Sequence, residues 1–320
     1  MPIFSRRSWL TAGAGLGLAV LLSACASAPT AVVPTATKPA PGVARVDLGG
    51  VTVTTLSDGV AVRPLDAGFV RNVPLADVQQ ALRDANLPTD KVEIPFVPLV
   101  VDMGGQRVLL DAGNGEFGAA TAGKLLESMA RAGIAPASIT AVVISHFHGD
   151  HINGLRNKAG ELVFPNARIH VPAPEWDWWM DDARMNAAPE NARGAFNNAR
   201  RVFGPIAGSV VKFQPGQEVL PGLRSMAAFG HTAGHTVFTI TGSRRTLLYW
   251  GDTANVAALF VRNPEWAVAF DQDAEAARKV RRQLADMAVE QNLLVAGYHL
   301  PGSAIGTLTR RGNGYEFTPL

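Results

Sequence analysis

The sequence predicts an α/β fold in which helices cover β-sheets. Runs of β-branched residues come early, segments with helical spacing are interleaved with later strands, and one strand is apolar enough to be buried on both faces. Of the 320 residues, 47% are hydrophobic and 18% are charged, proportions typical of a globular core. The pattern predicts layers of helix over sheet and leaves the topology of the sheets open.

Residues 1–25 resemble a bacterial export signal. Arg6 and Arg7 precede an apolar run, Thr11–Leu22, which is too short to cross a bilayer. The twin-arginine context is typical of proteins exported after folding. The motif Leu-Ser-Ala-Cys that ends at Cys25 resembles a lipobox, so Cys25 is the predicted lipidation site, and an ordinary cleavable signal is the alternative. We therefore expect a periplasmic protein anchored to the outer membrane as a lipoprotein.

The rest of the chain divides into a tether and one domain. Residues 26–45 are rich in Pro, Ala and Thr and carry almost no charge, which predicts an extended tether. Residues 46–320 suit a single α/β domain. The 29 Lys and Arg residues barely exceed the 27 Asp and Glu residues, so we expect no nucleic-acid partner, and contact with a membrane only through the lipid anchor.

In the first half of the domain, β-branched runs predict strands and a spacing of three to four residues predicts helices. Residues 103–106 contain a Gly-Gly pair that is expected to form a hairpin turn. The predicted strands are Val51–Leu56, Val92–Val101, Arg107–Asp111 and Ile139–Ile144, and the predicted helices are Leu75–Ala85 and Thr121–Ala132.

The second half alternates short strands with helical segments. Residues 174–203 have helical spacing in places, and an apolar stripe at residues 277–287 predicts a helix. The basic residues of that helix are expected on a solvated face; they are Arg278, Lys279, Arg281 and Arg282. The predicted strands are Arg168–Val171, Val210–Phe213, Leu223–Phe229, Val237–Thr241, Thr246–Trp250 and Leu293–Gly297.

Five of the seven histidines lie at predicted strand ends together with three aspartates. The densest group, Ser145-His-Phe-His-Gly-Asp-His151, directly follows the buried strand. Two imidazoles two residues apart in an extended chain point to the same side, and Gly149 lets the backbone turn so that the next two polar side chains face the same cavity. Four such side chains beside a core are costly unless a ligand binds them.

This H-x-H-x-D-H pattern resembles the first metal-binding motif of the metallo-β-lactamase superfamily. Three further segments match that superfamily in the same order along the chain. They are Phe229-Gly-His-Thr-Ala-Gly-His-Thr236, Trp250-Gly-Asp-Thr253 and Ala296-Gly-Tyr-His-Leu-Pro301. The resemblance implies an αββα sandwich, in which two mixed sheets face each other with helices outside and the metals lie at one sheet edge.

The resemblance also implies the ligands of two divalent metal ions. One ion is expected on His146, His148 and His231, the other on Asp150, His151 and His299, with Asp252 bridging them. Zn²⁺ suits this donor set best, and Mn, Fe or Co also fit. Two such cations share a hydroxide that attacks the substrate, and Asp150 and Asp252 are the ligands expected to take part in catalysis.

The resemblance is closest to the methyl parathion hydrolase and lactonase group. It is carried by Phe164-Pro-Asn-Ala, Trp178-Trp179, the segment Ala296–Gly306 and the tail Arg-Gly-Asn-Gly-Tyr-Glu-Phe. The common β-lactamases have a cysteine where this chain has Asp252, which disfavours that branch. We expect cleavage of small neutral lactones or aryl esters, with organophosphate triesters as a side activity. An N-acyl homoserine lactonase and a non-catalytic binding lipoprotein are the alternatives, and a homodimer is open because related enzymes are often dimers.

Several residues around the metals are assigned with alternatives left open. Phe117, Trp179 and Phe196 align with an aromatic substrate pocket in that group, and packing in the core is the alternative. Asn255 stands where the phosphotriesterases are leucine-rich, so the pocket is expected to be more polar, which favours lactones or esters. Asp111 is expected to support the ligand loop or to form a structural turn. His235 is expected either to support His231 or Asp252 or to hold its own turn, and His170 is expected at the surface.

Overall fold

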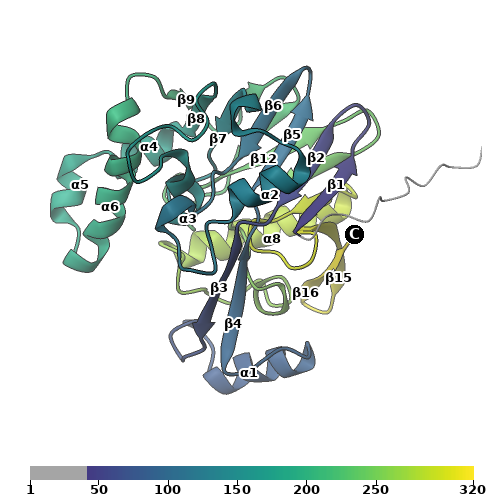
Figure 1. Ribbon diagram of the computed structural model, residues 1–320. Helices are drawn as coiled ribbons and strands as arrows, with labels where there is room; N and C mark the ends of the chain where they lie inside the picture. Colours follow the sequence, from purple (N-terminus) through teal and green to yellow (C-terminus); the bar gives the residue numbers. More distant parts are fainter. Residues whose placement is uncertain (1–41) are drawn as a thin grey trace, which may run out of the picture. The chain divides into compact units, whose positions relative to one another are not determined.

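The computed structural model describes residues 42–320. The predicted export signal, Cys25 and almost all of the tether lie outside these residues, so they stay predictions. Within the described range, no helix is both long enough and apolar enough to cross a membrane. Two mixed seven-stranded sheets form the centre of this part, and helices lie on their outer sides (Figure 1). The predicted αββα sandwich is therefore confirmed.

The first sheet has the order β1-β2-β5-β6-β7-β8-β9. Its first four strands are antiparallel, and β6 to β9 run parallel to one another. The strands are β1 (Val43–Asp47), β2 (Thr52–Leu56), β5 (Leu99–Met103), β6 (Gln106–Leu110), β7 (Ala141–Val143), β8 (Arg168–Pro172) and β9 (Val211–Phe213). The first strand begins earlier than the expected start of the domain, and β8 buries His170, which is only 7% exposed. The prediction that His170 lies at the surface was wrong, because His170 is in register with Val143 of β7, which belongs to the apolar cluster between the two sheets.

The second sheet has the order β10-β11-β12-β13-β14-β15-β16. Only β13 and β14 are parallel in it. The strands are β10 (Glu218–Leu220), β11 (Leu223–Ala227), β12 (Thr236–Thr241), β13 (Thr246–Tyr249), β14 (Leu294–Ala296), β15 (Ile305–Arg311) and β16 (Gly314–Pro319). The sequence prediction lacked the last hairpin, although its Asn-Gly turn is a typical hairpin signal.

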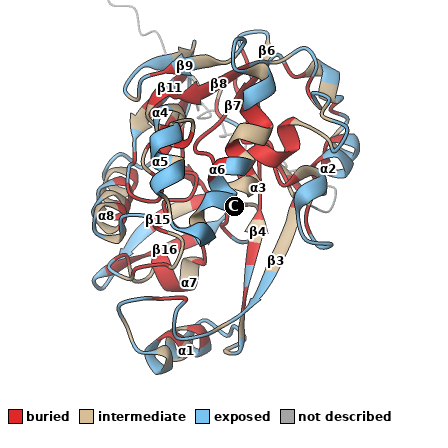
Figure 2. Cartoon of the chain, turned by 90° about the vertical axis from the view of Figure 1, so that its left-hand side faces the viewer, coloured by how far each residue is buried: buried red, intermediate tan, exposed pale blue. Residues whose placement is uncertain are grey.

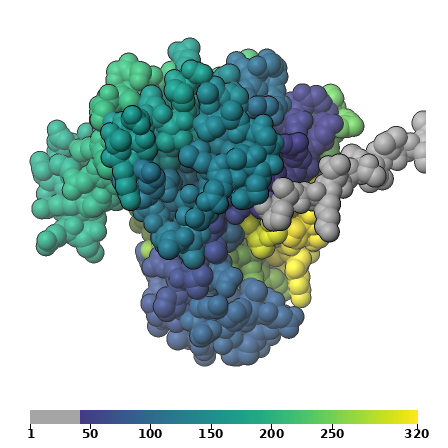
Figure 3. Space-filling model, in the orientation of Figure 1, coloured from purple at the N-terminus to yellow at the C-terminus, as the bar shows by residue number. Residues whose placement is uncertain are grey.

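The predicted strand Val92–Val101 is two strands in two different sheets. β4 (Lys91–Phe96) pairs with β3 (Gly59–Pro64) in a separate ribbon, whereas the next strand, β5, joins the first sheet. Pro98 lies between them and has no backbone N–H to continue a ladder. The ribbon leads to α1 (Leu75–Asp84), which lies at the bottom of Figure 1 and forms the blue lower part of Figure 3.

Helices cover both outer sides. They are α2 (Leu125–Ala132), α3 (Gly149–Ile152), α4 (Ala173–Trp179), α5 (Asp182–Ala187), α6 (Glu190–Phe203), α7 (Ala257–Phe260) and α8 (Ala274–Glu290), with 3₁₀ turns at Gly115–Phe117, Pro136–Ser138, Asn153–Leu155 and Gly204–Ile206. The helix expected from Thr121 starts only at Leu125, because Gly123 has a φ of 74° and the Asp58 carboxylate accepts the Leu125 N–H at 2.8 Å, as an N-terminal cap does.

Three apolar clusters hold the layers together. One fills the space between the two sheets, one packs α2, α4 and α6 on the first sheet, and one packs α1, α7 and α8 on the second. Figure 2 shows the buried strands between helices whose outer faces are exposed. Because parallel neighbours end at the same edge, β6 and β7 of one sheet and β13 and β14 of the other deliver their following loops to one place.

Candidate metal centre

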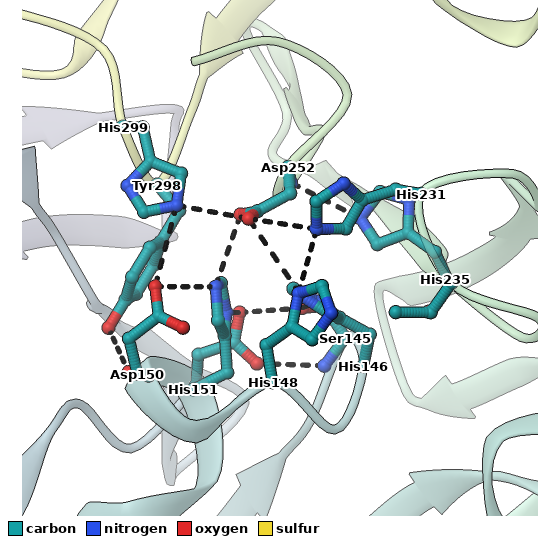
Figure 4. A network of polar contacts seen from close by, with 12 residues as sticks. Ser145, His146, His148, Asp150, His151, His231, His235, Asp252, Tyr298 and His299 are labelled. Atoms are coloured by element: carbon teal, nitrogen blue, oxygen red, sulfur yellow. Dashed lines mark hydrogen bonds and ion pairs between the residues drawn. The ribbon is translucent and has the colours of Figure 1, made fainter. Parts of the chain in front are cut away.

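The seven predicted ligands come together at this edge of the two sheets (Figure 4). The loop after β7 supplies two histidines, the first turn of α3 supplies an aspartate and a histidine, and the β11–β12 loop and the ends of β13 and β14 supply one residue each. In that order they are His146 and His148, Asp150 and His151, His231, Asp252 and His299. They fall into two groups, and in each group the candidate ligand atoms all lie within 4.8 Å of one another.

The first group contains three imidazoles and one carboxylate. His148 Nδ1 lies 3.0 Å from His146 Nε2 and 2.9 Å from His231 Nε2. Asp252 Oδ2 lies 3.2 Å from His231 Nε2 and 3.8 Å from His146 Nε2. Ligand atoms about 2.1 Å from a tetrahedral zinc ion are about 3.4 Å from one another. The spacing of this group therefore fits such an ion.

The second group contains two imidazoles and two carboxylates. Asp150 Oδ2 lies 3.5 Å from both His151 Nε2 and His299 Nε2. Asp252 completes the group with Oδ1 at 3.1 Å from His151 Nε2 and Oδ2 at 3.0 Å from His299 Nε2. One carboxylate thus belongs to both groups.

Two buried ligand atoms of this cluster lack hydrogen-bond partners, as expected of atoms that bind a cation. His151 Nε2 and Asp252 Oδ1 have no hydrogen-bond partner within residues 42–320, although they face each other. Burying polar atoms without partners is costly. A divalent cation bound between them would satisfy both, so the residues present fit the metals that the sequence predicted.

The outer nitrogens of four ligand histidines are held by hydrogen bonds. Ser145 Oγ lies 3.0 Å from His146 Nδ1, Asp111 Oδ2 lies 2.8 Å from His151 Nδ1, and Pro95 O lies 2.7 Å from His299 Nδ1. Asp271 Oδ1 lies 3.0 Å from His231 Nδ1. Such contacts set the tautomer and the ring orientation of metal ligands. All four rings therefore direct Nε2 toward the centre.

Asp111 and His235 take the supporting positions that the sequence left open. Asp111 is fully buried at the end of β6 and accepts hydrogen bonds from Ser145 as well as His151. His235 lies 3.0 Å from Ala228 O through Nδ1 and accepts the backbone N–H of Asp252 through Nε2 at 3.2 Å. Burial, reinforced by nearby His231, lowers the pKa of His235 to about 4, which keeps the ring neutral in this role. It therefore both holds its own turn and supports Asp252.

Arg281 is a correction to the sequence prediction. It was expected on a solvated face of α8, yet it is 1% exposed. Its guanidinium donates to Asp271 Oδ2 at 3.2 Å and to backbone carbonyls that include Thr253 O at 2.7 Å. Arg281 thereby holds Asp271, which in turn contacts His231. Its position four residues after Ala277 and three before Leu284 places it on the buried stripe of the helix, a signal that the predicted stripe overlooked.

Burial and the charges of the cluster together set the pKa values of the candidate ligands in the metal-free protein. Burial lowers the pKa of His148 to about 3. Burial raises the pKa of Asp150, but His151 and His299 outweigh it and hold that pKa at about 2. Burial lowers the pKa of His231, but hydrogen bonds to Asp252 and Asp271 outweigh it and raise that pKa to about 9.

The chain matches the sequence model of the metallo-β-lactamase superfamily over residues 98–296. This range contains every candidate ligand except His299. The chain belongs to the metallo-β-lactamase superfamily.

Solved structures of this superfamily share the fold. AidC, a dizinc quorum-quenching lactonase in complex with a product, N-hexanoyl-L-homoserine, superposes with a TM-score of 0.82 and 25% identity, over 87% of this chain and 97% of AidC. The hydrolase AbOPH gives a TM-score of 0.81 and 22% identity over the same shares. Ribonuclease Z of Pyrobaculum aerophilum is 37% identical over 71 residues, and this match spans only 22% of each chain. The superfamily prediction is thus confirmed.

The four residues predicted to line a substrate pocket lie in different surroundings. Trp179 is 3% exposed, its ring lies 6.5 Å from that of His148, and Phe196 packs against it at 4.9 Å. Phe117 is 37% exposed and lies under the Arg201 guanidinium at 3.8 Å. Asn255 is 3% exposed, and its Oδ1 lacks a hydrogen-bond partner within the described range. Trp179 is thus the neighbour of a candidate metal ligand. Trp179 and Phe196 both belong to the buried cluster that packs on the first sheet, which is the core packing that the sequence left open as the alternative.

Removing the metals with a chelator is expected to lower the thermal midpoint by on the order of 10 °C. Each ion present at about 100 times its Kd stabilises the folded state by about 2.7 kcal/mol, and about 1 kcal/mol corresponds to 2–4 °C for a domain of this size. Differential scanning calorimetry of chelated and zinc-loaded protein measures the difference. An unchanged midpoint would contradict two-metal binding.

The affinity of the centre for zinc is expected to depend on pH. Without metal, His231 keeps its proton up to a pH of about 9, and a ligand nitrogen must lose its proton to bind a cation. Zinc binding at pH 7 therefore releases protons, and the affinity weakens as the pH falls. Isothermal titration in two buffers of different ionisation enthalpy counts the protons released; identical heats in both buffers would contradict this expectation.

Proposed function

We propose that the protein is a two-metal hydrolase that cleaves lactones or aryl esters. The observation that carries the proposal is the pair of ligand groups joined by Asp252, in which every ligand expected of the superfamily is present. The likeness to a dizinc lactonase supports the reaction class. Hydrolysis of phosphotriesters is proposed only as a side activity, because Asn255 and Thr253 make the surroundings of Asp252 polar.

Each part of the centre has a task in this reaction. When bound, two divalent cations supply Lewis acidity and a hydroxide nucleophile near neutral pH. Asp252 is buried and contacts His231 of the first group and His299 of the second, so its carboxylate fixes the separation of the two groups. The Tyr298 hydroxyl donates to the backbone carbonyl of Asp150 at 2.6 Å and so steadies the first turn of α3. The nearly buried Trp179 lies beside the ring of His148 and helps to fix its position.

A substrate panel tests the proposal. Zinc-loaded protein is expected to hydrolyse an aryl lactone and an aryl ester with a kcat/KM at least about tenfold above that for a neutral phosphotriester, since pocket contacts discriminate by about 1–3 kcal/mol. The chelated protein serves as the control and should be inactive on all three. No turnover of any lactone or ester would contradict the proposal.

A second candidate is an N-acyl homoserine lactonase. The observation that favours it is AidC, which was solved with an N-acyl homoserine product. The same panel, extended by acyl homoserine lactones of increasing chain length, separates the two. If the acyl chain packs on an apolar surface near the ligands, each added CH₂ is worth about 0.8 kcal/mol, or about fourfold in kcat/KM. A flat dependence on chain length with faster aryl lactones would favour the broader hydrolase.

A further inference from the structure

Glu175 is a buried carboxylate that the metal groups do not use. It lies in the first turn of α4 and is 0% exposed. Its Oε1 accepts hydrogen bonds from Gly234 N at 2.8 Å and from the Thr232 hydroxyl. Its Oε2 accepts hydrogen bonds from Phe147 N at 3.1 Å and from the Trp179 indole N–H. Four donors thus compensate the cost of burying one carboxylate.

The positions of these donors connect Glu175 to one metal group. Phe147 stands between His146 and His148, and Thr232 directly follows His231. One carboxylate therefore ties together the two loops that carry all three histidines of the first group. The second group has other supports, because Asp111 holds the outer nitrogen of its first histidine and a backbone carbonyl holds that of its second.

The chemistry of the donors requires a carboxylate at this position. Two backbone N–H groups and an indole N–H can only donate, and they approach from opposite sides of the side chain. A carboxylate accepts on both oxygens, whereas an amide accepts on one side and donates on the other. Glutamine at 175 would therefore turn an NH₂ group against either Gly234 N or the donor pair formed by Phe147 and Trp179.

We propose that Glu175 is a positioning residue that sets the geometry of His146, His148 and His231 and, through the same carboxylate, the placement of Trp179 beside them. The inference rests on the two metal groups of the proposed function and on no particular substrate. It predicts that a change at Glu175 acts selectively on the first group.

The test is the metal affinity of each group in Glu175→Gln. Titration of metal-free protein with Cd²⁺, followed by ¹¹³Cd NMR, gives separate signals for the two groups because their nitrogen and oxygen donors differ. The affinity of the first group is expected to fall about 10–100-fold, as it does when partners of metal ligands are removed, while that of the second group stays unchanged. Equal losses at both groups, or no loss, would overturn the inference.

Two further variants separate positioning from general loss of stability. Thr232→Val removes one donor to the same carboxylate and is expected to weaken the first group to a smaller extent, which keeps the test available should Glu175→Gln fail to fold. Tyr315→Phe removes a partly buried hydrogen bond to Asp286 on α8 and is expected to leave both affinities unchanged. Wild-type protein that binds no Cd²⁺ would overturn the proposed function together with this inference. If Tyr315→Phe weakened the first group as much as Glu175→Gln does, the inference alone would be overturned.

Discussion

Replacing Asp252 with alanine is expected to lower kcat/KM for any lactone or ester substrate by about a thousandfold or more. Asp252 approaches ligand histidines of both groups, with Oδ1 at 3.1 Å from His151 and Oδ2 at 3.0 Å from His299 and 3.2 Å from His231. Its removal therefore weakens both metal sites at once. Polarisation by bound metal is worth several kcal/mol, and each 1.4 kcal/mol is a factor of ten in rate.

Steady-state kinetics and elemental analysis of Asp252→Ala check this expectation together. The metal content should fall below two ions per chain as the rate falls. Asp102→Ala is a matched control, because Asp102 forms an ion pair with Arg107 on the first sheet, away from the ligands, and both rate and metal content should stay at the wild-type level. Wild-type activity in Asp252→Ala would contradict a catalytic centre that depends on Asp252, whereas well under one metal ion per chain in the wild-type protein would favour a binding protein that keeps the fold.

The ligand set was predictable because its residues are clustered in sequence at strand ends. Residues 145–151 carry four of the seven candidates, in a loop and the first turn of the helix that follows it, and the buried strand before them predicts the sheet edge at which they lie. The remaining ligands occur in short segments that match superfamily motifs. The local pattern and the order of the motifs were therefore sufficient to predict the ligands of both groups.

The supporting residues were not predictable in the same way because their partners are distant in sequence. Glu175 contacts a backbone N–H 28 residues earlier and another 59 residues later, and no periodic pattern connects such positions. Arg281 was misassigned because a charged residue on an amphipathic helix is normally solvated, and only the buried carbonyls and Asp271 around it show why it is not.

The split of Val92–Val101 between two sheets has a related cause. A continuous β-branched run indicates extended backbone and carries no information about the partner strand. The change of sheet depends on Pro98 and on the separate pairing of β3 with β4, which are properties of the assembled domain. Periodicity therefore predicted where strands lie and not which sheet each one joins.

Asp111→Ala is expected to lower the free energy of unfolding by about 3–5 kcal/mol, the range observed when one partner of a buried charged network is removed. Asp111 is fully buried, and its carboxylate contacts Ser145 N and Oγ at 2.8 Å, His151 Nδ1 at 2.8 Å and the Tyr249 hydroxyl at 2.6 Å. Its φ of 60° adds to the cost, because alanine tolerates the left-handed region less well than aspartate or asparagine.

Urea unfolding of the metal-free protein measures this loss, and ¹¹³Cd NMR measures a second consequence. Since Asp111 contacts His151 directly and reaches His146 only through Ser145, the second metal group should lose about 10–100-fold in affinity and the first group should lose less. Asp58→Ala is the matched control, because Asp58 is equally buried and accepts hydrogen bonds from Asn114 and Leu125 without contacting a ligand. It should lose stability with no preference between the groups. A loss of affinity in Asp111→Ala no greater at the second group than at the first would show that Asp111 supports only the fold.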